Sequence, residues 1–172
     1  LSARGLRQSI RFNVAQLLPA DANAKLRDAV GRGVVRNFIR FIADLGLAQH
    51  QSPAQLCDRV SQIHGQANHD RARAMGKGVI IATAHLGSFE VGLAKTAADK
   101  PAVHVVFATD PFPRFDRMRT ALRRKLGVRE ARAEQGWEMW GRLRDALAAD
   151  EVVVMQADRV MPGQKGMVVP MA

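Results

Sequence analysis

The sequence contains a single cysteine, Cys57, among 172 residues, which excludes a disulfide framework and a thiolate metal cage. We therefore expect this chain to belong to a reducing compartment. Tyrosine is absent, and aromatic residues make up only 5% of the sequence. Proteins that bind RNA or single-stranded DNA usually stack bases on exposed aromatic side chains, so this scarcity argues against a nucleic-acid partner.

Long apolar runs are also missing. No stretch reaches the roughly 18 apolar residues that a membrane-spanning helix needs. The first residues, LSARGLRQS, lack the apolar core of a signal peptide and an initiator methionine, and the last ones, MVVPMA, read as the start of a strand. Because the initiator methionine is missing, we expect the natural protein to begin before residue 1. Because an apolar strand at a chain end leaves an unpaired sheet edge, we also expect it to continue beyond residue 172.

Basic residues are present in excess. Lys and Arg number 26 against 16 Asp and Glu, which gives a formal net charge of +10 at pH 7. This excess predicts attraction to an anionic partner, and composition leaves nucleic acid, acidic lipid and an acidic carrier protein open. Hydrophobic residues at 47% and charged residues at 24% are typical of a globular protein, so we expect residues 1–172 to form a single domain.

Residues 1–76 are predicted to form a helical lead-in. Apolar residues recur every three or four positions in 3–18 and in 22–46, which indicates two amphipathic helices. Ser52-Pro53 is typical of a helix start and predicts a third helix that includes Ile63. A polar segment then runs to a Gly-Lys-Gly sequence at 76–78.

The first of these helices is basic on one side, where it carries arginines at positions 4, 7 and 11. Such a helix is typical of proteins that lie on an anionic membrane surface. An ordinary helix that packs on the domain and exposes its arginines to solvent would show the same pattern.

The second part of the chain, 77–172, alternates between strands and helices. Strands are predicted at 79–83, 103–107 and 151–156, and a further one begins at 167–170. Helices are predicted between them, at 88–98, 114–126 and 134–149. This alternation predicts an α/β fold with a central, mostly parallel sheet flanked by helices. The continuous apolar run 79–83 further predicts a strand that is covered on both faces.

A histidine and a glutamate follow the first strand in the segment GVIIATAHLGSFE. His85 stands directly after the strand, where ligands gather in open α/β sheets. Gly87 allows a sharp turn, Ser88 can begin the next helix, and Glu90 falls in its first turn. A carboxylate that accepts one ring N–H would leave the other ring nitrogen free to take a proton, so this pattern predicts a base that activates a hydroxyl.

Both residues also have ordinary structural explanations. A lone histidine at a strand end is often part of the packing, and an acid in the first turn of a helix complements the helix dipole. The segment differs from the HExxH zinc signature, so no metal site is predicted. Cys57, in the lead-in, is expected to be packed and inert.

Two later segments carry further candidates. DPFPRFDRMRTALRRKLGV contains many arginines and ends with Arg123 and Gly127 in R-x-x-x-G spacing. On charge alone these arginines fit either a solvated helix face or a site for phosphates, and Arg119 belongs to the same group. The segment EVVVMQADRV is a strand followed by Asp158, which is either a turn residue or part of a site.

These blocks, in this order, resemble the late acyltransferases of bacterial lipid A biosynthesis, within the lysophospholipid acyltransferase superfamily. His85, Gly87 and Glu90 match that family's HX4(D/E) block, whereas Ser88 and Phe89 stand where the family typically has Asn and Trp. Arg123 matches its donor-side block. The lead-in also resembles the family's helical segment, so the resemblance covers nearly the whole chain and implies a glycerol-phosphate acyltransferase-like fold.

The resemblance implies that His85 is a general base oriented by Glu90. It further implies that the hydroxyl of a membrane glycolipid, a lipid A precursor, attacks a fatty acyl thioester. The donor would be an acyl-carrier protein or coenzyme A thioester, with no bound cofactor and no metal. The remaining candidates are binding residues for substrate or oxyanion: Gly87, Ser88, Arg119, Arg123 and Asp158.

The expected location is the cytoplasmic face of the bacterial inner membrane, either peripheral or held by a segment outside this chain. Other hypotheses stay open at this point. The acceptor could be another glycolipid or a lysophospholipid. In a different class, the chain could be a basic nucleic-acid-binding domain with a structural His85, or a pseudoenzyme that keeps the pair without a lipid tunnel.

Overall fold

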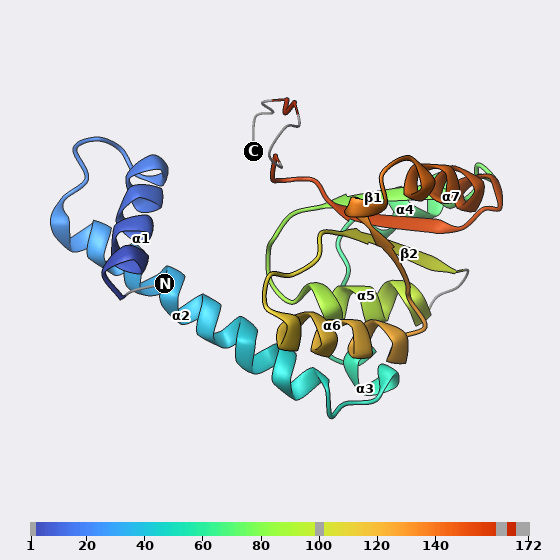
Figure 1. The fold of residues 1–172 in the computed structure, drawn as a ribbon, viewed down its shortest axis with the longest axis horizontal. Helices are drawn as coiled ribbons and strands as arrows, with labels where there is room; N and C mark the ends of the chain where they lie inside the picture. Colours follow the sequence, from blue (N-terminus) through green and yellow to red (C-terminus); the bar gives the residue numbers. More distant parts are fainter. Residues whose placement is uncertain (1–2, 99–101, 161–164, 168–172) are drawn as a thin grey trace. The chain divides into compact units, whose positions relative to one another are not determined.

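The computed structural model describes residues 3–98, 102–160 and 165–167. The chain divides into two units, Leu1–Leu47 and Ala48–Ala172 (Figure 1). The boundary expected at residue 76 falls inside the second unit.

The first unit is a helical hairpin. It contains α1 (Ala3–Leu17) and α2 (Ala24–Ala48), whose last residue belongs to the second unit. Asn23 begins α2 by accepting a hydrogen bond from the Leu26 N–H at 2.9 Å. The helices approach closely at Gly31, where a Cβ atom would lie 3.4 Å from Ile10 Cγ2. Within the described residues, neither these helices nor any other combines the length and apolar character needed to cross a bilayer.

The second unit contains a parallel sheet of four strands. They are β1 (Val79–Thr83), β2 (Val103–Phe107), β3 (Arg129–Arg132) and β4 (Val152–Gln156), in the order β1-β4-β2-β3. The sheet confirms the predicted α/β class. β3 was missed because its sequence, REAR, is polar. Of the strand expected at 167–170, Met167 is described without strand structure, and 168–170 lie outside the described residues.

The helices described in the second unit are α3 (Pro53–Cys57), α4 (Gln66–Arg73), α5 (Phe89–Ala98), α6 (Pro113–Lys125) and α7 (Trp137–Ala148), with a short 3-10 turn at Ala133–Gln135. Ser52 and Gln55 form a capping box on α3, but this helix ends at Cys57, well before Ile63. The predicted polar connection contains α4, which is attached to the unit by hydrogen bonds of 2.8 and 3.0 Å from Arg73 to the Asp150 carboxylate.

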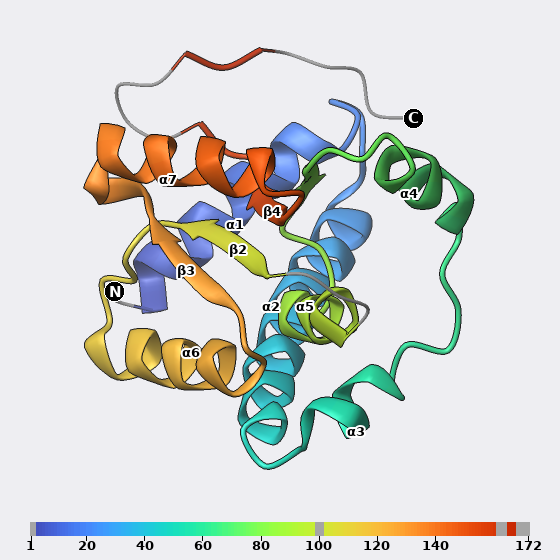
Figure 2. The same cartoon turned by 90° about the vertical axis from the view of Figure 1, so that its right-hand side faces the viewer.

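Helices cover both faces of the sheet. α7 lies on one face, and α5 and α6 lie on the other (Figure 1 and Figure 2). Under α7 the core is formed by Ala131, Met139, Leu143 and Val153. Alternate residues of β2, among them Val105 and Phe107, face the α6 side because side chains alternate along a strand.

β1 differs from its expectation. It lies at an edge of the described sheet, where β4 is its neighbour. Its side chains alternate in exposure, and Ile80 is 54% exposed. The prediction of a strand covered on both faces is therefore wrong for the described residues, because helix α7 packs on β3 and β4 rather than over β1. Gly78, just before β1, is required by a close approach: a Cβ there would lie 2.5 Å from Leu147 Cα.

Candidate active site

The carboxyl ends of β1 and β4 bring a histidine and an aspartate together. In the parallel register Thr83 pairs with Gln156, and the Ala157 N–H then donates to the Thr83 carbonyl at 2.8 Å. The strands end side by side, so the residues that follow them meet at the same edge of the sheet. His85 and Asp158 are these residues.

Asp158 holds His85 by two atoms. One carboxylate oxygen, Oδ1, lies 2.7 Å from the ring nitrogen Nδ1, and the other, Oδ2, accepts the backbone N–H of His85 at 3.1 Å. Both side chains are about one-third exposed, at 36% and 34%. Burial acts to raise the pKa of Asp158, but the hydrogen bonds from the His85 ring and backbone outweigh it and hold this pKa below its usual value.

The contact with Asp158 selects one tautomer of a neutral His85 ring. Asp158, with its lowered pKa, is ionised at neutral pH and can only accept hydrogen bonds. In a neutral imidazole Nδ1 must therefore carry the proton. The lone pair of Nε2 is then available to take a proton from another group.

Glu90 occupies a different environment. It lies in the first turn of α5 and is 1% exposed. Its Oε1 accepts a hydrogen bond from Nε of Arg119 at 3.1 Å. The acid that contacts the imidazole is thus Asp158, whereas the sequence led us to expect Glu90 there. Ser88 immediately precedes α5, and its carbonyl accepts the Gly92 N–H at 3.2 Å.

The turn between His85 and α5 depends on Gly87. This residue has φ of +62°, in the left-handed region that favours glycine. The expected sharp turn is therefore present, and it separates the exposed imidazole from the buried Glu90 only five residues later.

Arg123 is buried in the α6 side of the sheet. It is 1% exposed, and its guanidinium lies over the Phe107 ring at 4.1 Å from the centroid. Nη1 donates to Glu130 Oε1 at 3.0 Å, whereas the buried Nε and Nη2 have no hydrogen-bond partner among the described residues. Burial and the neighbouring Arg119 lower the pKa of Arg123. The sequence allowed a solvated helix face here, and the structure shows a buried cation.

Glu130 connects Arg123 to further polar side chains. It accepts the Thr120 hydroxyl at 2.9 Å and lies 3.5 Å from Arg132 Nη2. Arg132 also reaches Asp116 at 3.4 Å. Sequence reasoning missed Glu130 because it belongs to the unpredicted strand β3. Three of the four residues in REAR are charged, so its sequence carries no strand-like alternation that could have found it.

Large apolar side chains are exposed in the loops at this edge. Leu86 after β1, Phe112 between β2 and α6, and Val160 after β4 are 75%, 67% and 60% exposed. The carboxyl edge thus presents apolar side chains from three loops beside an exposed imidazole.

Cys57 lies away from this edge, in α3, and is half-buried with Sγ 3.3 Å from the Ala94 carbonyl. The described residues contain no group of three or more His, Cys, Asp and Glu side chains arranged to hold a metal ion.

The lowered pKa of Asp158 makes a prediction for stability against pH. The unfolded chain binds a proton at about pH 3.9, above the folded value, so stability falls as pH drops through the window below about 4. We expect Asp158→Asn to make the free energy of unfolding, measured by urea denaturation at each pH, less dependent on pH in this window. The change should be under about 1 kcal/mol, because partly exposed pairs contribute little. Parallel profiles for wild type and variant would contradict this.

The comparisons with known proteins show the family of this chain. No match was found among the curated proteins. The family model described as bacterial lipid A biosynthesis acyltransferase matches residues 2–171. Because that match extends over nearly all of the sequence, this chain belongs to the bacterial lipid A biosynthesis acyltransferase family.

Proposed function

We propose that this chain transfers a fatty acyl group from an acyl thioester to a hydroxyl of a lipid A precursor, with His85 as general base. The family is one of acyltransferases acting in lipid A biosynthesis. The observation that carries the proposal is the 2.7 Å contact between His85 Nδ1 and Asp158, on an exposed ring at the carboxyl edge of the sheet. In this proposal Asp158 orients the ring, and Glu90 supports the site from the buried side.

The proposed reaction needs one base and no covalent enzyme intermediate. Nε2 of His85 takes the proton of the acceptor hydroxyl while the hydroxyl oxygen attacks the thioester carbonyl carbon. The tetrahedral intermediate collapses with cleavage of the C–S bond, and the thiolate leaves with the proton from the imidazolium. An ester and a free thiol are formed, and Asp158 stabilises the imidazolium in between.

Charged donors near α6 would bind the anionic parts of the substrates. Arg123 is the strongest candidate, since two of its buried donor atoms have no partner among the described residues. A phosphate or an oxyanion would satisfy these donors. Arg119, already bonded to Glu90, and the backbone N–H groups of Gly87 and Ser88 complete the proposed binding set.

The proposed donors are acyl-carrier protein and coenzyme A thioesters. Both are anionic, which fits a chain with a net charge of +10. Both are cytoplasmic molecules, so the proposal includes a location at the cytoplasmic face of the bacterial inner membrane, with the acceptor supplied from the bilayer.

An acceptor-dependent thiol assay tests this function. With acyl-carrier protein or coenzyme A thioesters, we expect thiol release only when a lipid A precursor with a free hydroxyl is present, and mass spectrometry should show the acceptor heavier by one acyl group. An acceptor already acylated at its hydroxyls is the matched control. Release that is equally fast without acceptor would indicate a thioesterase, and transfer only to a lysophospholipid would replace the proposed substrate.

A further inference from the structure

A row of polar residues follows the strands at the carboxyl edge of the sheet. Two residues beyond the ends of β1, β4, β2 and β3, in their spatial order, stand His85, Asp158, Thr109 and Glu134. The parallel register keeps the strand ends level. His85 Nδ1 lies 2.7 Å from Asp158, and the Thr109 N–H donates to Glu134 Oε1 at 2.7 Å. The second contact therefore lies on the same edge as the proposed general base.

Side chains that follow or end β3 hold the loop between β2 and α6, residues 108–112. The Thr109 N–H bond to Glu134 is the main reason that the pKa of this glutamate is lowered. Arg132, the last residue of β3, donates to the Thr109 hydroxyl at 3.0 Å and to Asp116, in the first turn of α6, at 3.4 Å. One guanidinium thus joins the start of the loop to the helix that follows it, and a carboxylate fixes the loop backbone.

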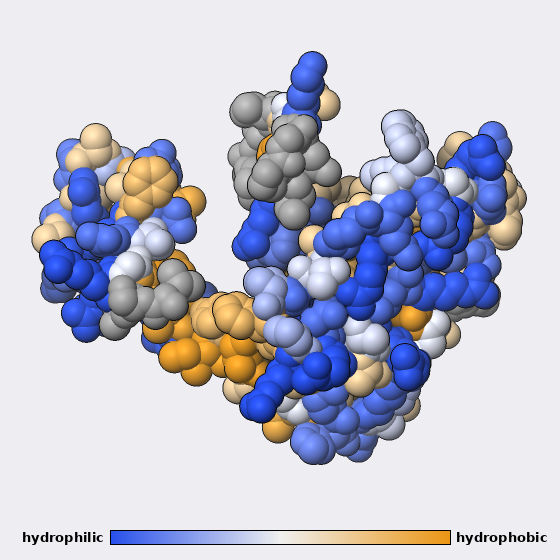
Figure 3. All heavy atoms as spheres, in the orientation of Figure 1, coloured by the Kyte–Doolittle hydropathy of each residue, from blue (hydrophilic) through white to orange (hydrophobic). Residues whose placement is uncertain are grey.

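The loop fixed in this way presents Phe112 to solvent. The Phe112 N–H donates to Asp110 Oδ1 at 2.9 Å, and its side chain is 67% exposed. Leu86 and Val160, in the loops after β1 and β4, are exposed as well. The surface that Figure 3 shows for the second unit is mostly hydrophilic. Large apolar side chains in three loops of one sheet edge are therefore better explained by an apolar ligand than by solvent.

We propose that the β2–α6 loop forms a wall of the acyl-donor site, in which Phe112 contacts the acyl chain and Glu134 is a positioning residue that holds the loop. β1 and β2 lie on either side of β4, so their ends are about 10 Å apart, at two strand spacings. A fatty acyl chain whose thioester lies at His85 can span this distance. Selectivity for long over short chains would then depend on Phe112. The inference rests on the proposed function, which supplies the acyl substrate.

Transfer from dodecanoyl and butanoyl thioesters tests the role of Phe112. In F112A, kcat/KM for the dodecanoyl thioester should fall at least about tenfold, because the chain loses the burial of a phenylalanine side chain. The value for the butanoyl thioester, which is too short to reach the loop, should change less than about twofold. F112L keeps a large apolar side chain and should retain most of the selectivity. Equal losses for both thioesters in F112A would overturn the assignment.

The role of Glu134 is tested by the separation of KM from kcat. E134A should raise KM for the dodecanoyl thioester about tenfold, because the loop loses the acceptor of the Thr109 N–H. Its kcat should stay within about threefold of wild type, since His85 and Asp158 are untouched. E134Q keeps an oxygen acceptor and should restore KM. The matched control, E138A, removes another exposed acid four residues later and should leave KM unchanged.

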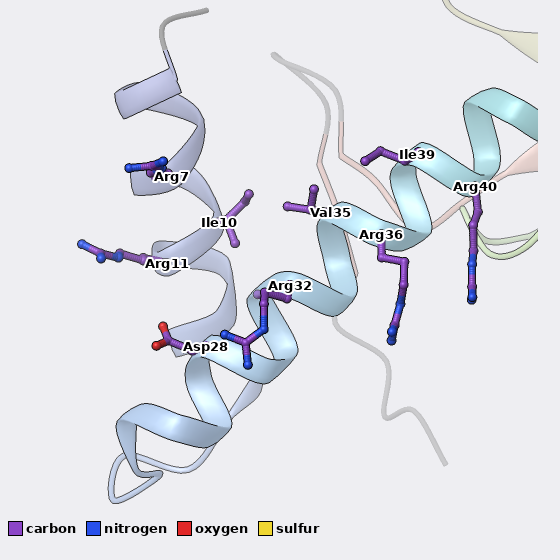
Figure 4. Close-up of a pocket in the computed structure, with 10 residues that line it drawn as sticks. Arg7, Ile10, Arg11, Asp28, Arg32, Val35, Arg36, Ile39 and Arg40 are labelled. Carbon is purple, nitrogen blue, oxygen red and sulfur yellow. The ribbon is translucent and has the colours of Figure 1, made fainter.

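A variant of Arg132 tests the other support of the loop. R132K keeps the charge, but an ammonium group cannot join Thr109 and Asp116 as the planar guanidinium does, so KM should rise as in E134A. The matched control is R36K, on an exposed arginine that extends from α2 away from α1 in Figure 4. Thermal unfolding of each variant checks that the change in KM is not a loss of folded protein.

Binding of dodecanoyl thioesters, measured by calorimetry, separates this inference from the proposed function because it needs no turnover. The probes are the thioesters of coenzyme A and of acyl-carrier protein. Weaker binding in F112A and E134A, in a protein that transfers no acyl group, would support the loop and overturn the proposed function. Transfer whose chain-length selectivity is unchanged in both variants would overturn the inference alone. Absence of both binding and transfer would overturn the two together.

Discussion

Replacement of His85 by glutamine is expected to lower kcat for acyl transfer about 10²–10⁴-fold, because it removes the proposed general base. The side chain is about one-third exposed, so the protein should fold normally. The measurement is thiol release under saturating donor and acceptor, with thermal unfolding as the control for folding. Transfer at the wild-type rate in a folded H85Q protein would remove His85 from the mechanism.

Asp158→Asn should cause a loss close to that of H85Q. The His85 backbone N–H requires an acceptor, so the amide oxygen of an asparagine would turn toward it. The amide NH₂ would then face Nδ1 and force the ring proton onto Nε2. The nitrogen that should accept the hydroxyl proton would already carry one, so we expect kcat to fall about 10²–10⁴-fold with little change in KM.

Glu90→Gln is the matched comparison, since it is the same isosteric loss of a carboxylate charge. Glu90 contacts Arg119 and is 1% exposed, so we expect the substitution to act mainly on stability. Its kcat should stay within about tenfold of wild type, because the variant keeps the general base, whose loss would cost about 10²–10⁴-fold. A large loss in E90Q together with a mild one in D158N would show that Glu90 orients the base, as the sequence alone led us to expect.

The local features of the fold could be predicted from the sequence. Apolar runs such as 79–83 and 103–107 specify strands by their own composition, although the first of them is exposed on one side. Helix starts such as Ser52-Pro53 depend on hydrogen bonds within a few residues. Gly87 was also predictable, because a strand followed at once by a helix needs a turn that glycine allows.

The partner of His85 could not be predicted, because it depends on the order of the strands. β1 and β4 are neighbours although two strands lie between them in the sequence, and this adjacency places Asp158 beside the ring. Glu90, close in sequence, was the natural choice. The burial of Arg123 has the same cause, since it depends on α6 packing over β2 and β3 and on the ring of Phe107.

The buried Arg123 predicts a large effect on stability when its partner Glu130 is removed. Glu130→Ala removes the acceptor of Arg123 Nη1 and leaves the guanidinium with no carboxylate at 3.0 Å, in a site where two of its donor atoms already have no partner among the described residues. Removing one partner of a buried pair costs about 3–5 kcal/mol, because the remaining charge stays desolvated. We expect a loss of this size in the free energy of unfolding, measured by urea denaturation.

The complementary variants separate the charge from the packing. Arg123→Met keeps an apolar side chain over the Phe107 ring and removes the buried cation, so it should be more stable than E130A. In the double variant R123M/E130A the two losses should be far from additive, with a coupling of about 1–3 kcal/mol. If the free energy of unfolding of E130A lies within about 1 kcal/mol of the wild-type value, Arg132 or water compensates for the lost carboxylate, and the prediction is wrong. R123M also tests the proposed function. If this variant is stable but no longer transfers the acyl group, the Nε and Nη2 donors of Arg123 bind the substrate.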